Sequence, residues 1–485
     1  MKYLFIVNNP ANWNLDIPEI EVVSARMYLA DEKYSSIRNA KVYNLCKSYR
    51  YQSAGYYVSL LASARGHKPV PNVLTIQDLK SQAIIKIVTD DLDRLIQSGL
   101  KSIQAESFTL SIYFGKNLAK KYDRLAAKLF THFQAPLLRA EFIRSNSVWL
   151  LTSIKTIAVN EVPDTHRLFV IEAAREHFKK RPSVSARKET RYDLAILVNP
   201  DETYPPSDEK ALQRFTKAAE ELDFYVERIT KQDQSRINEF DALFIRETTS
   251  VNHHTYRISR KAAAEGLVVI DDPESILRCT NKVFLAEILH KHKLPAPKTY
   301  IISPDNLKVV RQQLGFPCIL KQPDSSFSIG VVKANDYSEF LSMSGQLFEK
   351  SDLLIVQEFL PTTFDWRVGI LNRKPIYVCK YFMARKHWQI YERTQDGKTN
   401  SGRAETLLVE EAPAEVIQTA LSATNLFGDG LYGVDLKEIN GIPYVIEVND
   451  NPSIDSGIED EKLKENLYRI IMNDFLYRIE QKKRG

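Results

Sequence analysis

Three oxygen-bearing side chains near the C-terminus have the types and spacing that suit a divalent metal ion. Asp435 lies in one β-type run, and Glu447 and Asn449 lie in the next, on either side of Asn440-Gly441, a dipeptide typical of a hairpin turn. Carboxylate and amide oxygens are ligands that Mg²⁺ accepts together with substrate phosphates. The pattern predicts a magnesium site if the three side chains share one face. A polar outer face on an amphipathic hairpin is the alternative.

The length of the turn decides whether these side chains can meet, because side chains alternate along a strand. A two-residue turn would place Asp435 opposite Ile446, so that Asp435 and Glu447 face opposite ways. A three-residue turn over residues 439–441 would pair Asp435 with Val445 and bring Asp435, Glu447 and Asn449 to one face. We therefore predict the three-residue turn.

Two lysines and a serine-rich loop could bind phosphate. Lys282 falls in the first turn of a helix predicted to begin at Thr280, where the helix dipole disfavours a cation unless an anion is bound nearby. Lys321 ends a buried strand and must reach water or an anion, since an unpaired buried charge is costly. The loop that follows carries Ser326 and Ser328, whose hydroxyls can donate to phosphate oxygens.

A further strand, predicted over residues 364–371, has one charged face. Asp365 and Arg367 share that face, and Trp366 and Val368 take the other. This division suits the wall of a cleft. A surface strand with an ion pair fits the pattern equally well.

The pattern of elements predicts a multidomain protein of the α/β and α+β classes. Strands alternating with helices from residue 192 to residue 270 indicate a small parallel α/β unit, and no internal repeat is apparent. We predict four segments, which are an N-terminal α/β domain at 1–165, an exposed linker at 166–190, the small α/β domain at 191–278 and a catalytic domain at 279–480.

The composition of the 485 residues is that of a globular cytoplasmic protein. The net charge of +5 is small for this length and does not call for nucleic acid as a partner. The four cysteines lack metal-binding spacing, so we expect reduced core thiols. No apolar run is long enough to cross a membrane. The sequence leaves open whether the chain forms a homo-oligomer.

Taken in order, these motifs resemble the ATP-grasp superfamily, and most closely its RimK-like branch. The resemblance covers residues 192–458, and residues 44–67 resemble a RimK-like N-terminal domain. It implies an ATP-grasp fold and an ATP-dependent carboxylate–amine ligase that forms an amide through an acyl phosphate, releasing ADP and phosphate. ATP with Mg²⁺, or Mn²⁺ in its place, would be the cofactors. The carboxylate and the amine acceptor would include an amino acid such as glutamate and a small molecule, peptide or protein tail.

The resemblance also implies a role for each site residue. Lys282 and Lys321 would contact the α- and β-phosphates, Gln357, Glu358 and Phe359 would hold adenine, Asp365 would approach the ribose, Arg367, Lys380 and Arg403 would act at the transferred group with Asn400 beside it, and Asp435, Glu447 and Asn449 would bind the metal.

Two other classes of protein stay open at this point. One is a kinase on the same fold, which would stop after phosphorylating a hydroxylated substrate. The other is an ATP-binding module associated with RNA or the ribosome through the Tyr- and Arg-rich block at residues 44–67. His67, His253 and His254 are candidates for substrate contacts, although a single histidine is more often structural.

Overall fold

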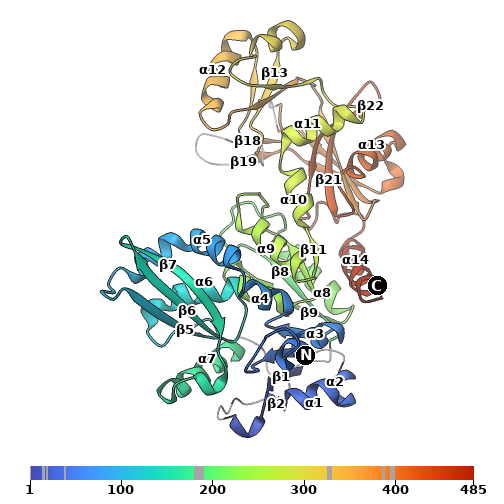
Figure 1. Ribbon diagram of the computed structural model, residues 1–485. Coiled ribbons are helices and arrows are strands. Elements are labelled where there is room, and N and C mark those ends of the chain that lie inside the picture. Colours follow the sequence, from blue (N-terminus) through green and yellow to red (C-terminus); the bar gives the residue numbers. More distant parts are fainter. Residues whose placement is uncertain are drawn as a thin grey trace. The chain divides into compact units, whose positions relative to one another are not determined.

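The computed structural model describes residues 2–13, 17, 20–37, 40–179, 190–324, 330–384, 388–393 and 399–484 (Figure 1). The chain divides into two compact units. The first contains residues 1–191 with 234–239, and the second contains residues 192–233 with 240–485. Within the described residues, no helix is long and apolar enough to span a membrane. All four cysteines are buried and unpaired, as expected from their spacing.

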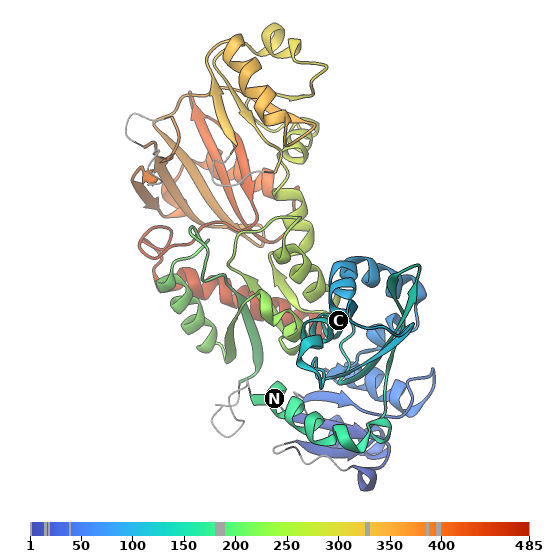
Figure 2. The same cartoon turned by 90° about the vertical axis from the view of Figure 1, so that its left-hand side faces the viewer.

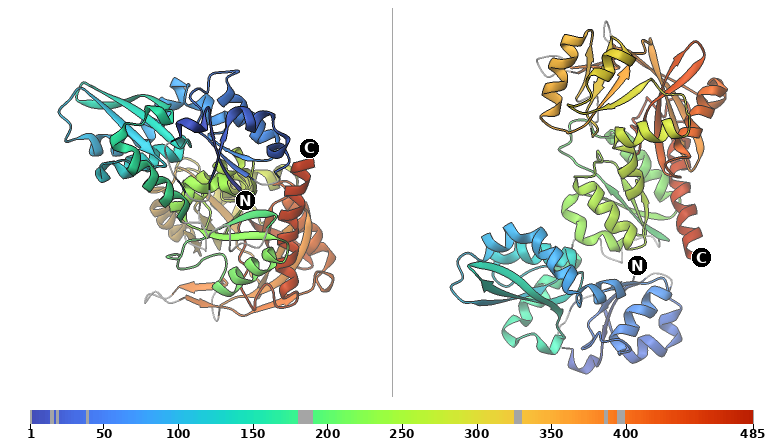
Figure 3. Two further views of the ribbon diagram at one scale, coloured as in Figure 1. Left: turned by 90° about the horizontal axis from the view of Figure 1, so that it is seen from below. Right: turned by 45° about the horizontal axis from the view of Figure 1, so that its top comes forward.

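The first unit contains two sheets, which Figure 3 shows in blue and teal. A parallel sheet has the strand order β2-β1-β3-β4, and an antiparallel sheet has the order β5-β6-β7. The elements are β1 (Lys2–Val7), β2 (Glu21–Ser24), α1 (Ala25–Ala30), α2 (Glu32–Ser35), β3 (Ala40–Asn44), α3 (Ala54–Ala64), β4 (Lys68–Val70), α4 (Val73–Asp78), α5 (Gln82–Leu100), β5 (Ser107–Tyr113), α6 (Asp123–His132), β6 (Leu137–Ser145), β7 (Val148–Thr156) and α7 (Arg167–Lys179).

The second unit begins with the small parallel α/β sheet that the sequence predicts, in the order β11-β10-β8-β9. Its elements are β8 (Tyr192–Leu197), α8 (Glu209–Glu220), β9 (Phe224–Ile229), β10 (Ala242–Ile245), α9 (His254–Ala264), β11 (Val268–Ile270) and α10 (Pro273–Cys279). The C-terminal helix α14 (Glu465–Arg484) returns to this part of the unit (Figure 2). Its Tyr468 and Phe475 pack with Phe215 and Phe244 in one core.

Two larger antiparallel sheets, in the orders β12-β15-β13-β14 and β20-β17-β16-β21-β22, and a two-stranded antiparallel sheet of β18 and β19 form the rest of the second unit. Their elements, with those that connect them, are α11 (Lys282–Lys291), β12 (Thr299–Ile302), β13 (Cys318–Lys321), β14 (Val331–Ala334), α12 (Tyr337–Phe348), β15 (Leu354–Glu358), β16 (Phe364–Leu371), β17 (Lys374–Phe382), β18 (Tyr391–Arg393), β19 (Thr399–Ser401), β20 (Ala404–Leu407), α13 (Ala414–Thr424), β21 (Leu431–Ile439) and β22 (Ile442–Asn449).

Two local expectations need correction. The helix that carries Lys282 is capped by Asn281, whose side chain accepts from the backbone N–H groups of Val283 and Phe284, whereas Thr280 ends α10. The segment expected to be a linker from residue 166 begins as helix α7, because its apolar face, which includes Val170 and its neighbours Ala173 and Ala174, is buried in the core of the first unit. Residues 180–189 of that segment lie outside the described residues.

The small α/β sheet has a counterpart in the first unit, although the sequence shows no obvious repeat. The segment β3–α3–β4–α4 corresponds to β10–α9–β11–α10, and α3 and α9 occupy residues 54–64 and 254–264, 200 positions apart. Both sheets are parallel with equivalent strand orders. One buried contact is also equivalent: Ser59 Oγ donates to the carbonyl of Pro71, and Ser259 Oγ donates to that of Asp271, each at 2.7 Å. The chain therefore carries this α/β segment twice.

The hairpin of β21 and β22 brings the acidic side chains together by a route different from the predicted one. Ile439 pairs with Ile442 across a two-residue Asn440-Gly441 turn, so the predicted three-residue turn is wrong. A β-bulge between Asp435 and Leu436 then shifts the register, because Ile446 is an extra residue in β22. Asp435 consequently pairs with Glu447, and Gly433 pairs with Asn449.

The turn demands glycine at its second position. Gly441 has φ +79°, where an L side chain is strained, whereas Gly345 lies inside helix α12 with open space around the position of a Cβ. We expect Gly441→Ala to lower the free energy of unfolding by about 1 kcal/mol and Gly345→Ala to raise it by about 0.5–1 kcal/mol. Thermal unfolding of both variants measures these changes. Equal shifts of the unfolding temperature in the two variants would contradict the turn geometry.

Candidate active site

A cavity of about 280 Å³ lies between the two larger antiparallel sheets of the second unit, and loops of the small α/β sheet extend its wall. Residues from several strands line it: Ile319 and Lys321 of β13, Gln357 and Glu358 of β15, Asp365 and Arg367 of β16, Asp435 and Lys437 of β21, and Ile446, Glu447 and Asn449 of β22, with Lys282 of α11 and Phe359. Many of the residues that the sequence singled out are thus brought to one place.

The first ion pair of the cavity joins Lys282 to Glu447. The Nζ atom of Lys282 lies 2.7 Å from Oε1 of Glu447, and the two side chains are 9% and 28% exposed. Burial acts to raise the pKa of the Glu447 carboxyl, but Lys282, Lys321 and Arg367 outweigh it and hold this pKa below its usual value. Glu447 is therefore a carboxylate that already sits among cations.

The second ion pair joins Arg367 to Asp435 in a bidentate arrangement. Nε and Nη2 of Arg367 donate to the two carboxylate oxygens of Asp435 at 2.7 and 2.8 Å. Asn449 Nδ2 also donates to Asp435 Oδ2, at 3.2 Å. The three predicted metal ligands, Asp435, Glu447 and Asn449, thus lie on one face of the hairpin and offer oxygen atoms, which is the donor chemistry that Mg²⁺ requires.

A third ion pair lies beside these two. Lys437 Nζ donates to Asp365 Oδ1 at 2.6 Å and to Thr362 Oγ1 at 2.7 Å. The sequence analysis did not select Lys437. Because alternate residues of a strand point to the same face, its position two residues after Asp435 was enough to predict it as a residue of the site. Burial raises the pKa of the Asp365 carboxyl, with Lys437 opposing the shift.

Lys321 is the cation of the cavity that has the fewest fixed partners. It makes no hydrogen bond or close ion pair within the part of the chain that the structure describes. Burial lowers the pKa of its ammonium group to about 8, against the opposing attraction of Glu447. A buried lysine that is not tied to one carboxylate is suited to meet an incoming anion.

Arg246 is a structural residue of the site that the sequence analysis did not select. It lies at the carboxyl end of β10, is 1% exposed, and donates to Asn451 Oδ1 at 2.8 Å and to the carbonyl of Pro452 at 2.8 Å. These contacts fix the turn that directly follows Asn449. An arginine at the end of a buried apolar strand was the available signal.

Two predicted catalytic residues lie away from the cavity. Lys380 pairs with Trp366 in the sheet, so its side chain takes the face opposite Arg367, with Nζ 5.0 Å from the Trp366 ring centre. Arg403 is exposed and lies over the ring of Phe382. Neither lines the cavity. The resemblance could not reveal this, because the face a residue takes depends on strand pairing that one sequence does not display.

Other predicted residues are only partly described. Ser326 and Ser328 lie outside the described residues, and so does the side chain of Asn400, whose backbone belongs to β19. In the segment predicted to hold adenine, Gln357 Nε2 donates to Thr299 Oγ1 at 3.0 Å, and Glu358 Oε1 accepts from the backbone N–H of Lys298 at 2.7 Å.

Two parts of the chain match known protein domains. Residues 25–173 match the RimK-like ATP-grasp N-terminal domain, and residues 279–471 match the RimK-like ATP-grasp domain. The alpha-aminoadipate–LysW ligase LysX of Saccharolobus solfataricus is 28% identical over 200 residues, which are 39% of this chain and 67% of the relative. A probable alpha-L-glutamate ligase of Vibrio vulnificus is 26% identical over 227 residues, covering 46% of this chain and 71% of the relative.

Among solved structures, D-alanine–D-alanine ligase from Bacillus anthracis aligns with 60% of this chain and 99% of its own, at 16% identity and a TM-score of 0.47. The two domain matches define the class: the chain belongs to the RimK-like ATP-grasp family and carries the RimK-like N-terminal domain ahead of the ATP-grasp domain. It is an ATP-dependent carboxylate–amine ligase, an enzyme that forms C–N bonds.

The lowered pKa of Lys321 predicts proton uptake when nucleotide binds. Near pH 8.5 most of the free protein has a neutral Lys321, since its pKa is about 8. Phosphate anions raise that pKa, so binding recruits up to about one proton. Calorimetric binding enthalpies in buffers of different ionisation enthalpy measure this uptake. It should vanish below pH 7 and in Lys321→Met, and equal uptake by Lys321→Met would contradict the assignment.

Proposed function

We propose that this ligase activates a carboxylate as an acyl phosphate with Mg·ATP and joins it to an amine, and that one of the two substrates is an amino acid such as glutamate. The other substrate would be a small molecule, a peptide or a protein tail. The observation that carries the proposal is the set of three ion pairs in one cavity, Lys282–Glu447, Arg367–Asp435 and Lys437–Asp365. The names of two relatives, which refer to glutamate and alpha-aminoadipate, guide the choice of substrate class.

The ion pairs supply both halves of a Mg·ATP site. Asp435, Glu447 and Asn449 would hold Mg²⁺, or Mn²⁺ in its place, through oxygen atoms, and the metal would screen the phosphate charge when bound. Lys282 and Lys321 would bind phosphate oxygens, and Lys282 would exchange Glu447 for them. These exchanges keep every buried charge compensated, which matters because an unpaired buried ion is costly.

Arg367 would face the phosphoryl group that moves from ATP to the carboxylate. Its guanidinium is half of a bidentate pair whose other half, Asp435, is a proposed metal ligand, so metal binding at Asp435 would release donor N–H groups toward the transferred phosphate. Lys380 and Arg403 do not line the cavity, and we do not assign them to the phosphoryl transfer.

The adenine would lie against apolar and hinge residues of the same cavity. Ile319 and Ile446 provide an apolar wall, and residues 357–360 line the cavity where β15 ends and the chain passes to the second sheet. The register shift at the bulge residue Ile446 pairs Glu447 with Asp435, and Ile446 itself also lines the cavity. Asp365, held by Lys437, would approach the ribose.

The carboxylate and amine would occupy the end of the cavity that the small α/β sheet closes. Thr248, Thr249 and Ser250 line it there, opposite the turn at residues 450–453. Thr249 Oγ1 donates to Asp450 Oδ2 at 2.8 Å, and burial raises the pKa of the Asp450 carboxyl to about 7. This polar end suits an amino acid with its own charged groups.

Release of ADP and phosphate across a panel of amino acids and peptides, with mass spectrometry of the products, tests the proposed reaction. We expect turnover to require both a carboxylate and an amine, and the product to have lost one water relative to its two precursors. A stable phosphorylated product formed without any amine would overturn the ligase mechanism in favour of the kinase alternative.

Glu447→Gln tests the metal assignment. We expect turnover to fall by at least about 100-fold, since even outer partners of metal ligands are worth about 10–100-fold. Glu438→Gln on the same hairpin is the matched control, because Glu438 accepts a hydrogen bond from Trp366 Nε1 and does not line the cavity. Comparable losses in the two variants would show that the hairpin fold, not the ligand, is being measured.

A further inference from the structure

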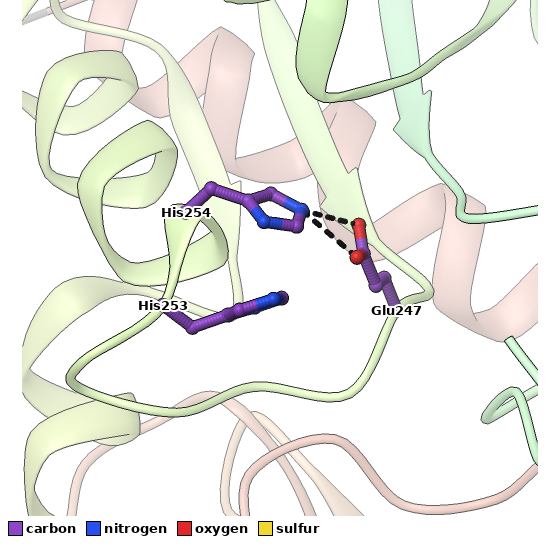
Figure 4. A group of neighbouring side chains, drawn as sticks. All are labelled: Glu247, His253 and His254. Atoms are coloured by element: carbon purple, nitrogen blue, oxygen red, sulfur yellow. Dashed lines mark hydrogen bonds and ion pairs between the residues drawn. The ribbon is translucent and has the colours of Figure 1, made fainter.

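A cluster of metal-ligating side chains lies outside the nucleotide site, in the second copy of the repeated α/β segment. Glu247 follows the end of β10 by two residues, and His253 and His254 stand at the start of α9. One ligand atom from each side chain can be chosen so that all lie within 4.8 Å of one another. Figure 4 shows both imidazoles and the carboxylate converging on the same space.

An ion pair alone does not account for the cluster. Glu247 is 2% exposed, and His254 Nε2 lies 2.9 Å from its Oε2 and 2.8 Å from its Oε1. Only the contact with Oε2 has hydrogen-bond geometry, so Oε1 is a buried carboxylate oxygen without a hydrogen bond among the described residues. A buried carboxylate oxygen without a hydrogen bond, close to two imidazoles, is a feature that a cation would satisfy.

The repeat shows that the fold itself does not need a histidine at position 253. At the position of His253, the first copy has Ser53, whose Oγ accepts from the N–H of Tyr56 and caps helix α3. His253 occupies the same capping position of α9 and makes no side-chain cap hydrogen bond. A serine there stabilises a helix by about 1 kcal/mol relative to a non-capping residue, so the histidine forgoes stability that the first copy retains.

The orientation of the histidines also suits a metal. The ring centres of His253 and His254 are 3.8 Å apart. His253 Nδ1 lies 3.1 Å from Thr255 Oγ1, a contact that orients the ring and leaves Nε2 as the ligating atom.

We propose that Glu247, His253 and His254 form a binding site for a divalent transition-metal ion of the zinc class. Two imidazole nitrogens and one carboxylate oxygen match the ligand preference of Zn²⁺, whereas the all-oxygen set at Asp435 matches Mg²⁺. Three protein ligands leave a coordination position open for water or for a carboxylate or amine of a bound substrate.

The site is connected to the wall of the active-site cavity. Thr248, Thr249 and Ser250, which line the cavity, lie in the loop between Glu247 and His253. The carbonyl of Glu247 accepts from Asn451 Nδ2 at 2.7 Å, and Asn451 belongs to the turn after the magnesium ligands. A metal ion that clamps both ends of this loop would therefore fix one wall of the substrate end of the cavity.

Zinc titration of the full-length protein by calorimetry, with the metal content after dialysis measured by mass spectrometry, tests the site. The informative variants are His253→Ser, which installs the capping residue of the first copy, and Glu247→Gln, which keeps the shape of the side chain. We expect one tight ion per chain in the unaltered protein and an affinity at least about 10–100-fold weaker in both variants. The control, His292→Ser, removes an exposed imidazole elsewhere and should bind zinc normally.

Two further measurements keep the outcome decisive. His253→Ser should unfold at the same or a higher temperature than the unaltered protein without metal, so that lost binding is not lost folding. ATP affinity in Mg²⁺ should be unchanged in the variants. Absence of tight zinc binding by the unaltered protein, or binding that persists in both variants, would overturn the proposal and leave a Glu247–His254 ion pair only.

Discussion

The compensation of buried charge is the constraint on which the rest of the site depends. The cavity gathers the cations Lys282, Lys321 and Arg367 and the carboxylates Asp435 and Glu447 in a partly buried space. A buried cation or carboxylate without a partner is costly, and burial accordingly lowers the pKa of Lys321, which has no hydrogen bond or close ion pair among the described residues. The ion pairs therefore compensate the buried charges in the absence of a bound anion and metal. The strands, the β-bulge and the Arg246 contacts place the paired groups close to one another.

Much of this arrangement could be predicted from the sequence, because it follows from local rules. The alternation of side chains placed Asp365 and Arg367 on one face, and the apolar runs predicted the strands that end at Lys321 and begin near Asp435. The bulge at Ile446 could not be predicted, since the Asn-Gly turn fixes one register and only packing of the hairpin in its sheet selects another. The position of Lys380 could not be predicted for a related reason: the face of the sheet that its side chain takes depends on the pairing of Lys380 with Trp366.

The duplicated α/β segment was hidden from the sequence analysis because the two copies share few side chains. What they share is structural: the parallel strand order, the equal length of α3 and α9, and the serine hydrogen bond to the next loop. Comparing the two copies shows which side chains the fold requires. Ser53 caps a helix, whereas His253 at the same position does not, and this difference directs attention to the Glu247 cluster.

We propose that Mg·ATP separates the ion pairs of the cavity, so that the cations bind phosphate and the carboxylates bind the metal. A crystal structure of the complex with magnesium and a non-hydrolysable ATP analogue tests it most directly. The account predicts that Lys282 Nζ, now 2.7 Å from Glu447 Oε1, moves to a phosphate oxygen while Glu447 and Asp435 coordinate the metal. A bound nucleotide and metal with the Lys282–Glu447 and Arg367–Asp435 pairs both intact would contradict it.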